Sequence, residues 1–177
     1  MTTLLAPTPG QTIGPFYGFA LPFDRGSELV PPRSPGAIRF HGHVLDGDGK
    51  PVPDVMLEIW QADADGFYQS PSETRGTADP NFLGWARCPA DMATGEYVFE
   101  TIKPGRVPFR DGRLMAPHIT FWIVARGINI GLQTRMYFPE EEAANAADPV
   151  LARVEQKSRI ATLVAKKEEG NIYRFDI

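Results

Sequence analysis

Short runs of β-branched and aromatic residues, separated by turn-forming residues, recur along the chain. They predict strands at residues 38–45, 55–61, 97–102, 118–126, 134–138 and 172–177. Residues 46–51 are Asp, Gly, Asp, Gly, Lys and Pro, which predicts a hairpin-like connection between the first two runs. The segment from residue 62 to about residue 87 has the composition of a polar loop. The pattern therefore predicts a mainly β protein with irregular connections.

Helical composition is found only late in the chain. Residues 140–146 and 149–155 are rich in Ala, Glu, Leu and Arg, and Asp148 precedes Pro149 as an N-cap precedes the first helical position. We expect two short helices on a late loop.

The first 37 residues have a different character from the rest. They contain seven prolines and show no period of either 2 or 3.6 residues, so they predict an extended arm. The arm also carries Phe16, Tyr17, Phe19 and Phe23. Because disordered tails are poor in aromatic residues, we expect it to dock on a surface of its own chain or of a partner. Residues 38–177 are expected to form one domain.

Composition narrows the functional classes. The chain has 177 residues, of which 42% are apolar and 23% charged, as is usual for a globular domain. Its net charge of −4 favours neither nucleic acid nor an anionic membrane as a partner. Cys88 is the only cysteine, and no apolar stretch reaches the length of about 18 residues that a membrane span needs. We also find no secretory signal at the start. A cytoplasmic location is expected.

Three histidines are candidate ligands. His118 opens the longest apolar strand, and a ligand two residues later would share its face, but that residue is Thr120. Taken in isolation, His118 is better explained as a hydrogen-bonded histidine at a strand start. His41 and His43 have the i, i+2 spacing, yet no third or fourth donor lies near them in the sequence. Two histidines at a strand edge are the simpler interpretation.

Two further residues could serve chemistry. Tyr68 lies in the expected loop, where a partly buried hydroxyl finds a hydrogen-bond partner. Arg135 lies on a short strand between apolar neighbours, where its planar guanidinium would suit a carboxylate. An internal ion pair is the alternative for Arg135.

Seven segments together resemble the intradiol ring-cleavage dioxygenases over nearly the whole chain. They are residues 12–17 (Thr-Ile-Gly-Pro-Phe-Tyr), 57–63 (Leu-Glu-Ile-Trp-Gln-Ala-Asp), 66–68 (Gly-Phe-Tyr), 79–82 (Asp-Pro-Asn-Phe), 101–105 (Thr-Ile-Lys-Pro-Gly), 117–119 (Pro-His-Ile) and 173–176 (Tyr-Arg-Phe-Asp). Each segment alone is weak evidence for this family, but the order of the segments and the intervals between them are specific to it. The resemblance implies an antiparallel β-sandwich with a loop-and-helix cover.

The resemblance also implies an incomplete metal site. Catalytic members of the family hold Fe(III) through two tyrosinates and two histidines. Tyr68 and His118 match the first ligand of each kind, whereas Val107 and Thr120 occupy the positions of the second tyrosine and the second histidine. Met115 replaces an arginine that the family pattern contains. Two protein donors do not retain ferric iron, so we expect no metal on this chain.

The replacement of two iron ligands resembles the pattern of the alpha-type chains in two-subunit members of the family. In those members, the beta-type partner holds the Fe(III). The resemblance implies a hetero-oligomer of alpha–beta pairs that cleaves 3,4-dihydroxybenzoate with O2 to 3-carboxy-cis,cis-muconate. It places Thr12, Gly14, Pro15 and Arg135 at the rim of the substrate cavity in the partner chain.

Two other functions compete with this interpretation. The chain could be a stand-alone β-sandwich adaptor that has lost its link to catalysis, or a self-sufficient iron enzyme with substitute ligands. The arm favours the subunit, because an adaptor has no evident need for it. Val107 and Thr120 argue against the iron enzyme.

Overall fold

The computed structural model describes residues 12, 14–31 and 34–177. In chain order its elements are α1 (Tyr17–Ala20), β1 (Ala37–His43), β2 (Met56–Trp60), β3 (Trp85–Pro89), β4 (Glu96–Ile102), β5 (His118–Val124), β6 (Leu132–Tyr137), α2 (Glu142–Ala146), the 3-10 helices η1 (Leu151–Arg153) and η2 (Lys157–Leu163), β7 (Lys166–Lys167) and β8 (Ile172–Arg174). No helix in this described part is long and apolar enough to cross a membrane.

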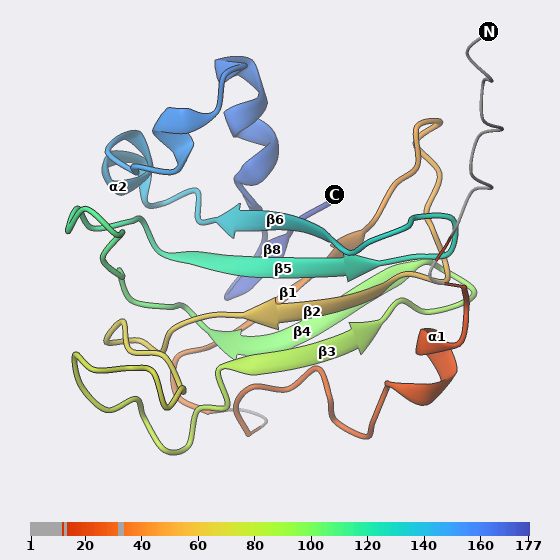
Figure 1. Cartoon of the computed structure of the whole chain (residues 1–177), viewed down its shortest axis with the longest axis horizontal. Coiled ribbons are helices and arrows are strands. Elements are labelled where there is room, and N and C mark those ends of the chain that lie inside the picture. Colours follow the sequence, from red (N-terminus) through yellow and green to blue (C-terminus); the bar gives the residue numbers. More distant parts are fainter. Residues whose placement is uncertain (1–11, 13, 32–33) are drawn as a thin grey trace, which may run out of the picture.

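The strands of the described residues form two four-stranded sheets, with the orders β4-β1-β8-β7 and β3-β2-β5-β6. All neighbouring strands are antiparallel except β1 and β8, which are parallel. Figure 1 shows the β3-β2-β5-β6 sheet in front of the other, with the late helices above one end. The prediction of a mainly β, antiparallel-rich fold with short helices on a late loop is confirmed.

Aromatic side chains from both sheets make the core. Phe40 of β1 stacks on Phe99 of β4 with 5.2 Å between ring centroids, and it meets Phe121 of β5 at 5.8 Å. Phe121 also lies 5.5 Å from Phe175, which follows β8. Burying one such side chain stabilises a fold by about 1.5–3 kcal/mol, so this cluster holds the two sheets face to face.

The predicted hairpin between residues 38–45 and 55–61 is wrong as a strand pairing. The turn itself forms, because the Val52 amide donates to the Val44 carbonyl at 2.8 Å and Leu45 forms a bridge with Pro51. However, β1 and β2 then enter different sheets. Turn residues fix a local reversal of the chain, whereas the core decides which strands pair.

Other boundaries also differ from the sequence prediction. The expected loop at residues 62–87 contains the start of β3, in which Ala86 and Cys88 face the core. The helix expected at residues 149–155 is the shorter η1, and η2 and β7 follow where no element was predicted. The N-cap residue of η1 is Val150 rather than the predicted Asp148, but the Asp148 carboxylate still accepts the amides of Val150 and Leu151.

The described part of the predicted arm packs on the domain. Tyr17 of α1 is buried against Met56 and Val124, and Leu29 and Val30 belong to the main core. Residues 1–11, 13, 32 and 33 of the arm lie outside the described residues. The division at residue 37 stays a prediction, although the core extends beyond it toward the N-terminus.

Candidate functional site

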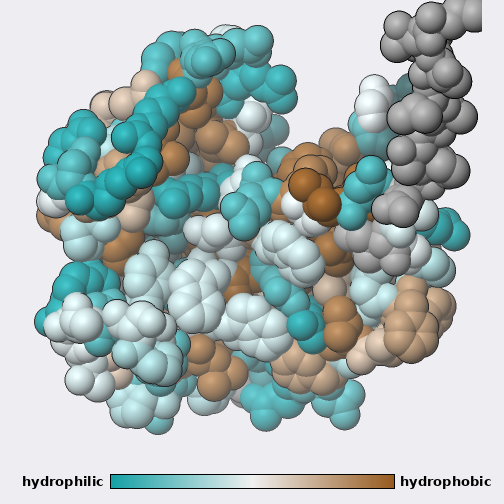
Figure 2. Space-filling model, viewed as in Figure 1, coloured by the Kyte–Doolittle hydropathy of each residue, from teal (hydrophilic) through white to brown (hydrophobic). Residues whose placement is uncertain are grey.

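The start of β5 forms the floor of the candidate site. His118 and Thr120 lie on the outward face of the front sheet, because the intervening Ile119 points into the core. Trp60 of β2 is the cross-strand partner of Thr120. Figure 2 shows this outward face as a pale zone of intermediate hydropathy beneath a more hydrophilic cover. The site therefore lies between the sheet and its loops.

Asp63 shapes the loop that delivers Tyr68. Its buried carboxylate accepts the backbone amides of Asp65, Phe67 and Asp79 at 2.9–3.0 Å. Tyr68 then stacks on Trp60 with 5.9 Å between ring centroids. No role was predicted for Asp63 from the sequence, although an Asp two residues before an Asp-Gly pair is a signal for such a turn.

Two glycines allow this loop to touch the turn that carries Val107. A Cβ atom on Gly66 would lie 2.3 Å from the Arg106 carbonyl oxygen, and one on Gly105 would lie 2.4 Å from the Ala64 carbonyl oxygen. The Gly105 amide also donates to the Asp63 carbonyl at 2.7 Å. Close backbone packing thus brings Val107 into one apolar cluster with Met115 and Tyr68.

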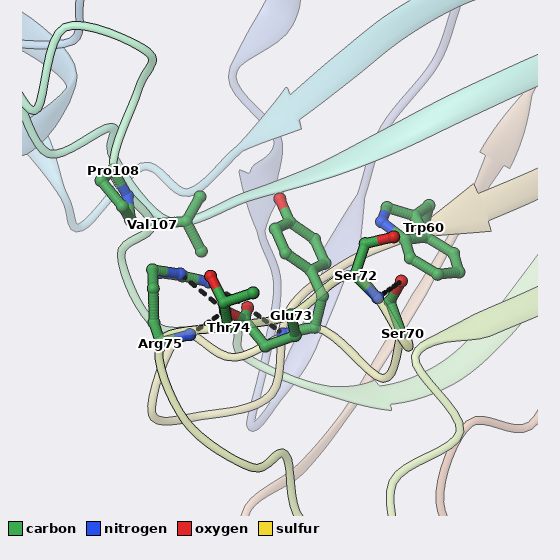
Figure 3. Close-up of a pocket in the computed structure, with 9 residues that line it drawn as sticks. Trp60, Ser70, Ser72, Glu73, Thr74, Arg75, Val107 and Pro108 are labelled. Atoms are coloured by element: carbon green, nitrogen blue, oxygen red, sulfur yellow. Dashed lines mark hydrogen bonds and ion pairs between the residues drawn. The ribbon is translucent and has the colours of Figure 1, made fainter.

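A hollow of about 360 Å³ opens beside this cluster. It is lined by Trp60, Tyr68, Ser70, Ser72, Glu73, Thr74, Arg75, Val107 and Pro108. Figure 3 shows Val107 and Trp60 on opposite sides of it, with the Glu73–Arg75 ion pair below Val107 in this view. The size suits a small organic molecule.

Arg135 of β6 is the cross-strand partner of Thr120 of β5. Its Nη1 atom contacts the Met115 sulfur at 3.4 Å, and it makes no ion pair with any described residue. It lines a second hollow of about 360 Å³ with Thr120, Gln133, Thr134, Tyr137, Val150, Leu151, Val154 and Leu163. One wall of that hollow is apolar and the other carries a cation, an arrangement that suits an aromatic carboxylate.

The surroundings of the site favour the uncharged forms of His118 and Tyr68. Burial, with the nearby charge of Arg135, lowers the pKa of His118 to about 4, and His118 Nδ1 lies 2.8 Å from the Ala116 carbonyl oxygen. Burial also raises the pKa of Tyr68, although Arg135 and Arg75 oppose the shift. The imidazole is therefore neutral and the phenol protonated near pH 7.

These residues do not fit a ferric ion. Val107 has no donor atom and Thr120 offers only a neutral hydroxyl, so Tyr68 and His118 are the two remaining donors at these positions. In the part of the chain that the structure describes, no group of three or more His, Cys, Asp or Glu residues could hold a metal ion.

The structure does not bring all the predicted substrate residues together within this chain. The Thr12 hydroxyl accepts the amides of Gly127 at 2.8 Å and Gly14 at 3.3 Å, beyond the C-terminal end of β5. Pro15 lines an apolar hollow of about 340 Å³ near α1. Arg135 lies toward the other end of β5, a strand about 20 Å long. The two groups form separate contact regions of this chain.

His41 and His43 lie elsewhere, on the other sheet. The two ring nitrogens of His41 contact Glu96 and Glu168, and His43 lies 3.7 Å from Asp176. Gly42 between them lets the chain after β8 approach, because a Cβ atom there would lie 2.0 Å from the Phe175 carbonyl oxygen. Each histidine has its own carboxylate partners, so the interpretation as strand histidines accounts for them.

Comparisons with known proteins show which family this chain belongs to. The family model described as Dioxygenase matches residues 14–177. The protocatechuate 3,4-dioxygenase alpha chain of Pseudomonas putida is 41% identical over 188 residues, covering 98% of this chain and 92% of that one. The beta chain of Burkholderia cepacia protocatechuate 3,4-dioxygenase is 37% identical over 145 residues, covering 77% of this chain and 61% of that one.

Solved structures share the fold. The dioxygenase domain of a dioxygenase and carbohydrate-binding fusion protein from Streptomyces sp. SirexAA-E aligns with a TM-score of 0.61 and 26% identity over 97% of both chains. Catechol 1,2-dioxygenase from Acinetobacter sp. ADP1 aligns with a TM-score of 0.57 and 21% identity, over 85% of this chain and 55% of that one. The chain belongs to the intradiol ring-cleavage dioxygenase family, in which it resembles protocatechuate 3,4-dioxygenase alpha chains over nearly its whole length.

Proposed function

We propose that this chain is the alpha subunit of a protocatechuate 3,4-dioxygenase and that a beta-type partner chain holds the Fe(III). The observation that carries the proposal is the 41% identity to a protocatechuate 3,4-dioxygenase alpha chain over nearly the whole length, and the expected ligand losses at Val107 and Thr120 support it. The reaction is the intradiol cleavage of 3,4-dihydroxybenzoate by O2 to 3-carboxy-cis,cis-muconate, in which both oxygen atoms enter the product. The iron of the partner supplies the oxygen chemistry.

In this proposal, the chain shapes the substrate cavity and places a positive charge in it. Arg135 has no carboxylate partner among the described residues and can pair with the substrate carboxylate. Thr12, Gly14 and Pro15 form a second region, in which small side chains allow the backbone to approach the partner. Because the two regions lie at opposite ends of β5, each contributes separately to the assembly.

We place the assembly in the cytoplasm. The only cysteine, Cys88, is buried and free, so the chain does not depend on an oxidising compartment. A stand-alone adaptor is less favoured, because the similarity to alpha chains extends over 92% of the length of the Pseudomonas putida relative.

Co-expression with a beta-type chain tests the proposal. With an affinity tag on this chain only, we expect both chains to elute together and the pair to consume O2 when 3,4-dihydroxybenzoate is added. Each chain expressed alone serves as the control and should show little uptake. Failure of the chains to co-elute, with no gain in O2 uptake on mixing, would rule the subunit role out.

A further inference from the structure

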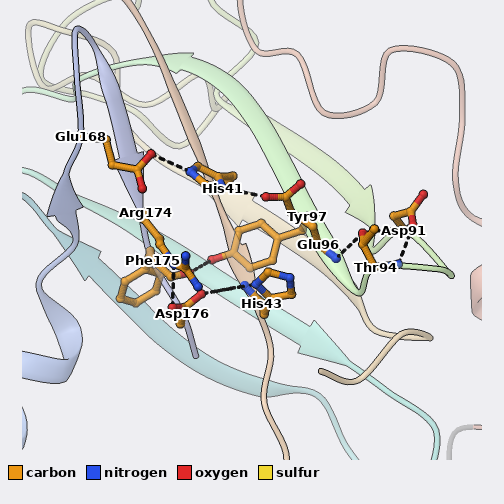
Figure 4. A network of polar contacts seen from close by, with 10 residues as sticks. All are labelled: His41, His43, Asp91, Thr94, Glu96, Tyr97, Glu168, Arg174, Phe175 and Asp176. Atoms are coloured by element: carbon orange, nitrogen blue, oxygen red, sulfur yellow. Dashed lines mark hydrogen bonds and ion pairs between the residues drawn. The ribbon is translucent and has the colours of Figure 1, made fainter. Parts of the chain in front are cut away.

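His41 contacts a carboxylate with each of its two ring nitrogens. Nδ1 lies 2.8 Å from an Oε atom of Glu96, and Nε2 lies 3.0 Å from an Oε atom of Glu168. Glu96 begins β4 on one side of β1, and Glu168 lies in the turn that joins β7 to β8 on the other side. Figure 4 shows the imidazole between the two glutamates. A single side chain therefore bridges across the sheet.

The two contacts of His41 depend on its protonation state. Ionised carboxylates only accept hydrogen bonds, so both ring nitrogens of His41 must donate, which requires the imidazolium form. A neutral imidazole donates through one nitrogen and turns the lone pair of the other toward a carboxylate. We propose that His41 is a pH-sensitive latch, which fastens the β7–β8 hairpin to β4 when protonated and releases one glutamate when neutral.

Other charged groups surround the latch. Arg174 of β8 is the parallel cross-strand partner of His41, and its guanidinium pairs with Asp176 at 2.9 Å. Lys166 of β7 pairs with Arg174 in the sheet, and the His43 amide donates to the Asp176 carboxylate at 3.1 Å. The positive charges of Arg174 and Lys166 and the negative charge of Asp176 therefore lie on or next to β7 and β8, beside His41.

The balance of these effects favours the charged ring. Burial lowers the pKa of His41, but hydrogen bonds and charges from Glu168 and Glu96 outweigh it and raise the pKa above 6.5. For a group whose pKa is raised by folding, the stabilisation is complete below the unfolded pKa and is lost as the pH rises through the folded pKa. The latch is therefore closed in mild acid and opens toward alkaline pH.

The hairpin is connected to the candidate site. The Ala165 amide, just before β7, donates to the Tyr137 carbonyl at 2.9 Å, and Val164 forms a bridge with the same residue. Leu163 lines the hollow that also contains Arg135. If the β7–β8 hairpin becomes more mobile, residues 163–165 would transmit this mobility to the wall of the hollow that contains Arg135.

Nuclear magnetic resonance of the full chain tests the latch. The sequence has three histidines, so His41→Gln and His43→Gln variants assign the ring signals. We expect the His41 ring to titrate above 6.5 with protons on both nitrogens at low pH. The exchange protection of the Glu168 amide, which donates to the Ile172 carbonyl, should fall about threefold to tenfold between about pH 6 and about pH 9, after correction for intrinsic exchange.

Matched variants separate the latch from general loosening. His41→Gln should lose the pH dependence and show low protection of the hairpin even in mild acid, whereas His43→Gln should keep the wild-type profile. Glu168→Gln keeps the imidazole and removes one carboxylate, so it should lower the pKa of His41 and weaken the hairpin. The inference is overturned if His41 titrates at or below 6.5, or if hairpin protection is the same in the wild type, His41→Gln and Glu168→Gln.

Discussion

Replacing Arg135 with alanine in the assembled alpha–beta pair is expected to raise the KM for 3,4-dihydroxybenzoate by about tenfold to a hundredfold, with iron content unchanged. Arg135 lies in a hollow with one apolar wall, its Nη1 atom contacts the Met115 sulfur, and it forms no ion pair with any described residue. A guanidinium without a protein carboxylate is available to the carboxylate of the substrate. Catechol lacks that group, so its KM should change much less.

Two further variants make this result specific. Arg135→Lys keeps the charge but loses the planar fork, so it should give an intermediate KM. Arg39→Ala removes an exposed arginine from β1 in the other sheet and should leave both substrates unaffected. Equal effects of Arg135→Ala on 3,4-dihydroxybenzoate and catechol would show a structural role for Arg135 instead.

Replacing Asp148 with alanine is expected to lower the free energy of unfolding by about 3–5 kcal/mol. The fully buried carboxylate accepts the amides of Ala116 at 2.8 Å, Val150 at 2.7 Å and Leu151 at 2.8 Å. It therefore ties the segment before His118 to the cover over the site. Alanine leaves these buried amides without partners.

Urea denaturation measures this loss of stability. Asp91→Ala is the matched control, because the Asp91 carboxylate also accepts two backbone amides, those of Ala93 and Thr94, but lies in an exposed turn. Water can replace Asp91, so its removal should cost clearly less. If the two variants lost equal stability, the anchoring role of Asp148 would be refuted.

The sequence pattern predicted strand positions better than strand pairing. Residues 97–102 alternate as a strand does, and Tyr97 and Phe99 are indeed buried in the core. By contrast, β1 and β2 looked like a hairpin but joined different sheets, because pairing depends on contacts distant in sequence. The start of β3 was not predicted, because its core-facing residues, Ala86 and Cys88, are small and do not form a β-rich pattern. Trp85 and Arg87 face outward.

The candidate site was predictable mainly through family resemblance. Tyr68 and Val107 meet because Gly66 and Gly105 allow two loops to touch, a contact that no local pattern reveals. The unpaired state of Arg135 among the described residues also depends on the whole fold. The separation of Arg135 from Thr12 along β5 could not be deduced without the strand register.

Metal analysis of this chain, purified alone from iron-replete cells and compared with the co-purified pair, tests the central claim most directly. The claim predicts almost no iron on the isolated chain, because Val107 and Thr120 replace two ligands, and about one iron in each alpha–beta pair, with a visible tyrosinate band. About one tightly held iron per isolated chain, with the same visible band, would contradict it.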